Sequence, residues 1–219
     1  MAIDTYDGLC ASIADFLNRR DLTAQIPDFI RLAEAAVDAD DRFRILPAIT
    51  RSQALIDGSQ ADQWGQYFLP IPHDYLSMQN FRVLDLPPPA RIELVTQTQM
   101  DDLRTTQRVG PPRYYALAGE TMELLPAPPT GIDYTVQMVY YSKVPALSVD
   151  NQSNWLLRLN PNVYLYGALI HSAPYLKDDE RIMVWKSQYE QLAENLNAAD
   201  GRAQFSGSTM KMRTRQRYR

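Results

Sequence analysis

The stretch Ile132–Tyr141, IDYTVQMVYY, carries the clearest strand signal in the chain. Polar side chains at Asp133, Thr135 and Gln137 alternate there with apolar ones. Because successive side chains of a strand point to opposite faces, this pattern predicts a strand with one buried face. The residues on the apolar side are Ile132, Tyr134, Val136, Met138 and Tyr140.

Residues 44–160, which surround this stretch, have the pattern of a β-rich domain. They contain 12 of the 15 prolines, and their apolar residues alternate in short runs, so long helices are excluded here. One short helix is expected at Gln97–Thr106, where Met100 and Leu103 share a face. The other expected strands are Ser52–Ile56, Gln66–Pro70, Ser77–Leu84, Ile92–Val95, Arg113–Leu117 and Thr121–Leu125.

Helical periodicity precedes this domain. Apolar residues recur at steps of three and four from Asp4 or Thr5 to Arg20, and again from Ile26 to about Arg42. Pro27 suits the first turn of the second helix, where a missing N–H costs nothing. The link between the two helices is short, so we expect them to lie antiparallel.

Helical periodicity returns at Pro161, and Pro174 ends this third helix. Asp178 or Asp179 then caps a fourth helix, whose apolar seam alternates spacings of three and four. The seam consists of Ile182, Trp185, Tyr189, Leu192 and Leu196.

The simplest assembly of these elements is an α+β fold. Residues 1–43 and 161–199 contribute the two helix pairs of a four-helix bundle, and residues 44–160 form an inserted β-rich domain. Residues 200–219 are expected to be an extended, flexible, basic C-terminal tail.

Charge separates the tail from the body of the chain. The net charge is −4, but the last nine residues carry +5 without an acid, so residues 1–210 carry −9. An acidic body argues against general nucleic-acid binding, which depends on clustered basic residues. Basic residues occupy every second position of the tail, so an extended tail presents them on one side. The candidate partner-binding residues are Met210, Lys211, Met212, Arg213, Arg215, Arg217, Tyr218 and Arg219.

Three interpretations of this tail remain open: a solvated disordered segment, a strand added to the edge of an acidic partner, or a contact with nucleic-acid phosphates. The acidic body favours the protein partner.

No catalytic, cofactor or metal site is predicted. His73 follows a strand in a proline-rich turn, and His171 lies in an apolar helix, so both suit structural roles. Asp38, Asp40 and Asp41 resemble the start of a calcium loop, but Arg42 stands where the next ligand belongs. The motifs of hydrolases, phosphate-binding loops and zinc sites do not occur.

The N-terminus carries no signal-peptide pattern, which predicts synthesis in the cytoplasm. No membrane partner is expected, because the apolar part of the uncharged run after Leu159 is too short to span a bilayer.

A series of short motifs follows one another along the chain in a characteristic order. The motifs are Tyr6–Leu9, Ile71–Leu76, Gly110–Tyr115, Leu124–Pro128, Tyr140–Tyr141, Asn154–Leu157, Pro161–Leu169 and Asp178–Arg181. In this order and spacing, over roughly residues 5–205, the chain resembles the head-tail adaptors of tailed bacteriophages, the portal-tail adaptor or tail tubular protein A group.

This resemblance implies a non-enzymatic virion protein at the head-tail interface. It implies a ring of identical copies, a dodecamer, that binds the portal, offers a platform for tail nozzle or tail fibre proteins, and extends the DNA channel used in genome ejection. Double-stranded DNA passes such a channel without specific binding. The alternatives from other classes are a nucleic-acid-binding module that acts through the tail and a tail-associated cell-wall hydrolase.

Overall fold

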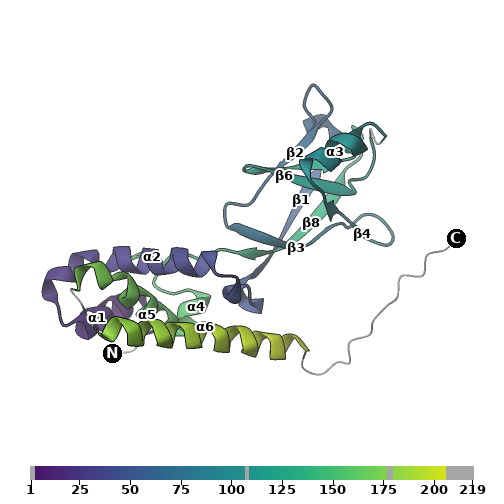
Figure 1. The fold of residues 1–219 in the computed structure, drawn as a ribbon. Coiled ribbons are helices and arrows are strands. Elements are labelled where there is room, and N and C mark those ends of the chain that lie inside the picture. The colour runs from purple at the N-terminus through teal and green to yellow at the C-terminus, as the bar shows by residue number, and fades with distance from the viewer. Residues whose placement is uncertain (1–2, 107–108, 177–179, 206–219) are drawn as a thin grey trace. The chain divides into compact units, whose positions relative to one another are not determined.

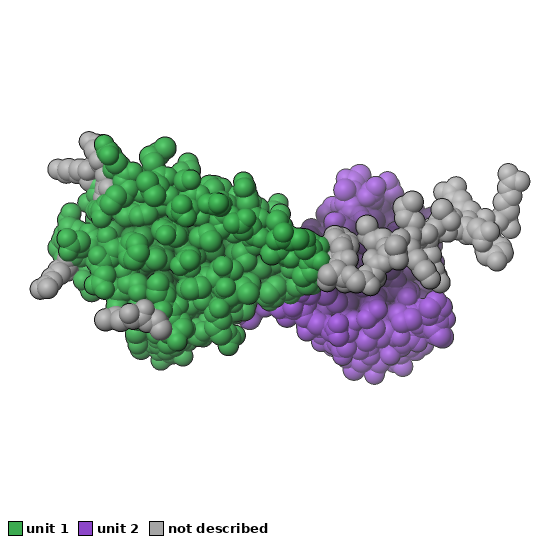
Figure 2. Space-filling model, turned by 90° about the horizontal axis from the view of Figure 1, so that it is seen from below, with its two compact units in different colours: residues 1–48, 144–219 green, residues 49–143 purple. Residues whose placement is uncertain are grey.

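In a computed structural model, described for residues 3–106, 109–176 and 180–205, the chain divides into two units with separate cores (Figure 1). Unit 1 comprises Met1–Ala48 and Val144–Arg219, and unit 2 comprises Ile49–Lys143. Figure 2 colours unit 1 green and unit 2 purple.

Unit 1 is helical. Its α-helices are α1 (Tyr6–Leu17), α2 (Ile26–Ala39), α4 (Trp155–Leu159), α5 (Pro161–His171) and α6 (Arg181–Phe205). Its 3-10 turns are η1 (Arg20–Gln25), η2 (Asp41–Phe43), η3 (Leu46–Ala48) and η5 (Ala173–Tyr175).

Local signals set the ends of these helices. The Thr5 hydroxyl accepts from the Gly8 N–H at 3.1 Å and caps α1, which ends where Asn18 takes a left-handed conformation. Pro27 lies in the first turn of α2, as expected. The predicted caps of the last helix, Asp178 and Asp179, lie outside the described residues.

The centre of unit 1 is α5, which packs against α1, α2, α4 and α6. A Cβ added at Gly167 of α5 would lie 3.1 Å from the Cβ of Ala33 on α2. The missing side chain therefore lets these two helices approach closely. The buried residues of α5 are Val163, Tyr164, Leu165, Gly167, Ala168 and Leu169.

The four-helix bundle with an inserted β-rich domain, expected from residues 1–43, 161–199 and 44–160, is wrong, although the fold is α+β. A bundle needs four helices that each bury one stripe, but α5 buries residues all around its circumference and is surrounded by the others. The short helix α4 is one of its neighbours, and residues 144–160, grouped above with the β-rich segment, belong to unit 1.

Unit 2 contains two four-stranded sheets. Sheet A has the order β1 (Ile49–Ile56), β8 (Tyr134–Ser142), β3 (Tyr75–Val83) and β4 (Ala90–Arg91). Sheet B has the order β2 (Tyr67–Pro70), β7 (Thr121–Leu125), β6 (Tyr114–Ala118) and β5 (Glu93–Leu94). All neighbours are antiparallel except β5 and β6. The turn η4 (Gly58–Gln60) and the helix α3 (Gln97–Arg104) complete the unit.

The core of unit 2 contains side chains of both sheets. Val136 and Met138 of β8 are buried there beside Phe81 of β3, and the Phe81 ring meets Tyr115 of sheet B edge-on at 5.3 Å. The predicted strand at Ile132–Tyr141 is confirmed from Tyr134 onward.

The pattern of β8 differs from the prediction at two positions. Ile132 precedes the strand and is exposed, and Gln137, assigned above to the polar side, is only 4% exposed. The reason is that β8 lies between β1 and β3, so the Gln137 amide is covered by neighbouring strands and bonded to Arg82.

Candidate interaction surfaces

The residues considered for catalysis do not form a site. His73 is exposed, and the carboxylate of its neighbour Asp74 accepts from the Tyr140 hydroxyl at 3.0 Å. His171 ends α5 half-buried, and this burial lowers the pKa of its imidazole. Within the described ranges, no three His, Cys, Asp or Glu side chains are grouped so that they could hold a metal ion.

Three polar side chains form a buried cluster in unit 1. Glu34 Oε1 accepts from the Leu147 N–H at 2.8 Å and from the Tyr164 hydroxyl at 3.3 Å. Asn154 Nδ2 donates to the Tyr164 oxygen at 2.6 Å and to the Pro145 carbonyl at 2.7 Å. We call Glu34, Asn154 and Tyr164 the buried clasp.

Burial explains the titration behaviour of the clasp. Removal from water raises the pKa of Glu34, although its hydrogen bonds from Leu147 and Tyr164 oppose this effect. Burial also raises the pKa of Tyr164, and the nearby Glu34 charge adds to it. Every member bonds to other parts of unit 1, so the clasp fastens the segment after Val144 to α2 and α5. These contacts are those of a structural element.

A second polar group connects the end of α2 with α6. Arg42 donates to Asp40 and Glu190, with both closest N–O distances at 2.6 Å. These hydrogen bonds raise the pKa of Arg42. Burial alone raises the pKa of Asp40, but the bonds from Arg42 outweigh it and hold that pKa below its usual value. The aspartates that resembled a calcium loop thus include one that is an ion-pair partner.

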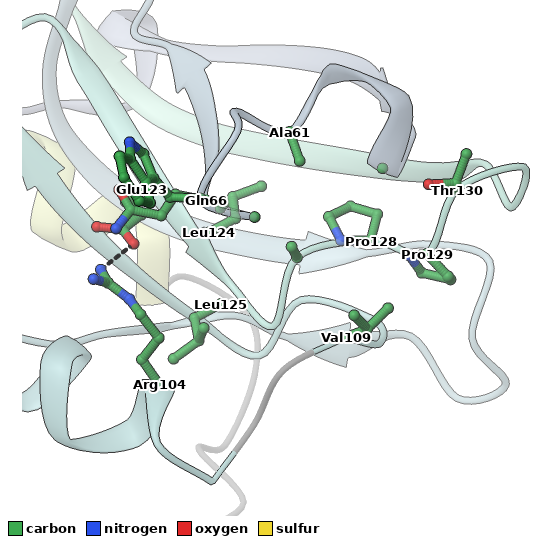
Figure 3. A pocket seen from close by; sticks show the side chains of 14 residues that line it. Ala61, Gln66, Arg104, Val109, Glu123, Leu124, Leu125, Pro128, Pro129 and Thr130 are labelled. Carbon is green, nitrogen blue, oxygen red and sulfur yellow. Dashed lines mark hydrogen bonds and ion pairs between the residues drawn. The ribbon is translucent and has the colours of Figure 1, made fainter.

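Unit 2 contains a pocket of about 460 Å³ between the turn around Trp64 and the segment Ala127–Thr130 (Figure 3). Trp64 is 76% exposed at its rim. In the same pocket, Arg104 Nη2 donates to the buried carboxylate of Glu123 at 2.5 Å. The other described lining residues are mainly apolar, and Arg104 and Glu123 neutralise each other's charge.

The outward face of sheet A carries a polar row across all four strands. In register, Gln53 of β1 lies opposite Gln137 of β8, followed by Arg82 of β3 and Arg91 of β4. Arg82 donates from Nε and Nη2 to Gln137 Oε1 at 3.1 and 2.7 Å. Arg51 lies on the same face, two residues before Gln53, because side chains alternate along the strand.

Apolar residues share this face with the arginines, and no acidic residue occupies a strand position there. Within the described ranges, Arg51, Arg82 and Arg91 have no ion pair. We call this surface the arginine face. Its other strand residues are Ile49, Leu55, Ser77, Asn80, Thr135, Val139 and Tyr141.

The predicted partner-binding residues, Met210 to Arg219, lie outside the described residues. The arginine face was not predicted from the sequence. Arg51, Gln53 and Leu55 alternate with smaller residues, which was a usable signal for one strand. Arg82 and Arg91 could be added only once the strand pairing was known.

The matched family agrees with the resemblance found in the sequence. Residues 4–215 match the family described as SU10 adaptor protein, which confirms the expected kinship with phage head-tail adaptors. No curated protein matches the chain. Within the described ranges, every helix is too short or too polar to cross a lipid bilayer. Since the match spans nearly all of the 219 residues, the chain belongs to the SU10 adaptor protein family.

Proposed function

We propose that this chain is the structural head-tail adaptor of a tailed bacteriophage, forming a ring between the portal and the tail nozzle that extends the DNA channel. The family match over residues 4–215 carries this proposal, because it indicates an adaptor with a structural role in a phage. The ring, its position and its twelve copies come from the resemblance to head-tail adaptors.

The described geometry supports a structural role. Glu34 and Tyr164, whose pKa values burial raises, are bonded to each other and to neighbours in unit 1. Catalytic acids and bases need access to a substrate, whereas these groups connect segments of the fold. Each unit has its own core, so two firm building blocks are available for contacts with partners.

The basic tail is proposed to dock each subunit on the portal or on a neighbouring copy. Its candidate contact residues are those from Met210 to Arg219 named above. A basic segment on an acidic chain gains from an acidic partner edge, and an extended segment can order upon contact. The acidic remainder of the chain favours free passage of DNA, because phosphates meet like charge there.

Negative-stain imaging of the purified chain, alone and mixed with portal rings of its own phage, tests the adaptor role. We expect rings on the portal, and we expect deletion of Lys211–Arg219 to abolish or strongly weaken attachment. Unchanged attachment of the shortened chain would refute the docking role of the tail. Absence of rings in every mixture would refute the adaptor proposal.

The same protein preparation tests the two alternatives. A nucleic-acid-binding module would bind duplex DNA with an affinity that falls steeply with salt and is lost with the tail. A cell-wall hydrolase would release fragments from purified cell wall, and mutation of His73 would reduce that release. We expect neither result.

A further inference from the structure

The arginine face is unusual for this chain because its charge is opposite to that of its surroundings. Residues 1–210 carry −9, yet the described strands of sheet A place three arginines and no acid on this face. Arg82 and Arg91 are cross-strand neighbours, and Arg51 lies on the outer strand β1. Within the described ranges, Arg82 donates side-chain hydrogen bonds only to Gln137, and the Arg51 and Arg91 side chains form no hydrogen bond or ion pair. These guanidinium groups therefore remain available for carboxylates.

The composition of this face is that of a protein interface. Arg and Tyr are enriched where proteins meet, and Leu55 is 62% exposed beside the arginines. Apolar side chains gain little from DNA phosphates, whereas a protein partner can bury them. Among the described residues the face also reaches an unpaired edge, because β1 pairs there only with β8 and is the longest outer strand of the two sheets.

A complementary surface exists at one end of unit 1. The start of α1 is joined to the segment after Ser148, since the Tyr6 and Asp7 N–H groups donate to the carbonyl and side chain of Gln152 at 2.8 and 3.2 Å. Gln152 in turn donates to the Val149 carbonyl at 3.0 Å. These bonds gather exposed acids around Val149, which is itself 75% exposed. We call this surface the acidic end, formed by Asp4, Asp7, Val149 and Asp150.

We propose that the arginine face of one copy binds the acidic end of a second copy. The two surfaces are complementary in charge and in their exposed aliphatic side chains. Arg51 and Arg91 of one copy face the carboxylates of the other, and Leu55 contacts the region of Val149. The two surfaces differ, so the contact is heterologous and can repeat from copy to copy until a ring closes. This inference rests on the ring proposed above and names the surfaces that build it.

The size of the arginine face predicts a weak single contact. Four strands about 4.8 Å apart, of which the longest have nine residues, give an area of about 400 Å². Stable pairs bury about 800 Å² on each partner, so one such contact is weak and ring closure or attachment to the portal must reinforce it. Self-association should therefore depend steeply on protein concentration and on salt.

Charge reversal on each surface tests the contact. One variant carries Arg51→Glu and Arg91→Glu, and a second carries Asp4→Lys, Asp7→Lys and Asp150→Lys. All these side chains are exposed, so circular dichroism and melting temperature should match those of the wild type. The matched control carries Arg113→Glu and Lys186→Glu, which make the same charge change as the first variant at exposed positions outside both surfaces.

Sedimentation velocity at rising concentration and ring counting on portal by negative stain provide the readouts. We expect each reversed variant alone to lose association by at least tenfold, and the control to retain it. A mixture of the two reversed variants should recover, because each acidic face then meets a basic end and each basic face an acidic end.

The remaining outcomes distinguish failure of the proposed contact from failure of the proposed function. Association of the Arg51→Glu, Arg91→Glu variant at the wild-type level would overturn the contact. If only the acid-reversed variant loses association, the contact is likewise overturned, and the acidic end is assigned to the basic tail instead. Failure of the mixture to recover would also overturn it. Binding of a short duplex DNA that depends on Arg51 and Arg91, without self-association, would assign the face to nucleic acid. A wild type that forms no rings, free or on portal, would contradict the adaptor role itself.

Discussion

The Tyr164 hydroxyl donates to Glu34 Oε1 at 3.3 Å, and this bond joins α5 to α2 inside the core of unit 1. Glu34 and Tyr164 are 7% and 1% exposed, so neither group reaches solvent to a useful extent. The same carboxylate oxygen holds the Leu147 N–H, which fixes the chain where it returns from unit 2 to the helices. The hydrogen bonds of Glu34 thus lie where the chain re-enters unit 1 and must follow one path.

Replacement of Glu34 by glutamine should make folding stability less dependent on pH. The pKa of Glu34 is raised by burial above its ordinary value of 4.5, so the folded chain favours the protonated carboxyl. The stability that proton binding to Glu34 contributes is full below the ordinary pKa and is lost as the pH rises through the pKa of the folded state. We expect the melting temperatures of the wild type and of Glu34→Gln to converge near pH 4, and the variant to be the more stable at pH 7.

Glu34→Ala is the control for this prediction. It leaves the Leu147 N–H and the Tyr164 hydroxyl without their acceptor, which should cost about 1–3 kcal/mol at any pH. Thermal unfolding followed by circular dichroism between pH 4 and 8 measures all three proteins. If the melting temperatures of the wild type and the glutamine variant change with pH in parallel, burial does not dominate the pKa of Glu34.

Removal of Arg42 should loosen the connection between α2 and α6. Arg42→Ala breaks bonds to Asp40 and Glu190, and the Arg42 side chain is 29% exposed. We expect a loss of about 1–2 kcal/mol in the free energy of unfolding, measured by urea denaturation. The matched control is Arg19→Ala, whose ion pair with Asp21 is well exposed and screened by solvent, so its loss should change stability much less. Equal effects of the two substitutions would contradict the role of Arg42.

Two glycines on helices should respond to alanine in opposite directions. In Gly167→Ala the new Cβ lies 3.1 Å from the Cβ of Ala33, which is fixed to the backbone of α2. Overpacking of this kind costs about 1–3 kcal/mol and exceeds the gain of about 1 kcal/mol in helix propensity. In Gly201→Ala of α6 no atom lies within 4 Å, so the propensity gain should remain. Melting temperatures of the two variants should fall and rise respectively; a rise in both would mean that α2 and α5 can separate.

The sequence predicted local structure well because its signals there are local. Thr5 and Pro27 fixed the starts of α1 and α2, and alternation around Val136 fixed β8. The packing of the helices could not be obtained in this way. A run of five helical residues from Trp155 to Leu159 is too short to show a period, and α5, apolar all round, carries no stripe that identifies its neighbours.

The candidate surfaces could be predicted from the sequence even less than the helix packing, because they depend on pairing between distant segments. Arg82 and Arg91 are nine residues apart and become neighbours only through the β3–β4 ladder, while Gln137 reaches them from β8. Asp7 and Asp150 are likewise brought together by a single glutamine, Gln152, far from α1 in the sequence. The spacing of the motifs identified the family because each motif is a short local stretch and their order can be read along the chain. A surface assembled from distant segments has no such spacing.

The final prediction concerns Arg104 and Glu123 in the pocket of unit 2. The Glu123 side chain is 5% exposed and that of Arg104 is 34% exposed, so the carboxylate depends on the guanidinium for its neutralisation. Arg104→Met keeps the aliphatic stem but leaves a buried charge unpaired, and we expect unit 2 to lose about 2–3 kcal/mol. Urea denaturation measures the loss, and hydrogen exchange assigns it to residues 49–143.

The second partner of Arg104 provides the control. Asp101 is 68% exposed at 3.3 Å from Arg104, so Asp101→Ala should change stability by at most about 0.5 kcal/mol. Adding Glu123→Gln to Arg104→Met removes the uncompensated charge and should restore at least half of the lost stability. If the double variant is no more stable than Arg104→Met, the cost comes from lost packing of the arginine stem rather than from an unpaired carboxylate, and the ion pair has no special place in holding unit 2 together.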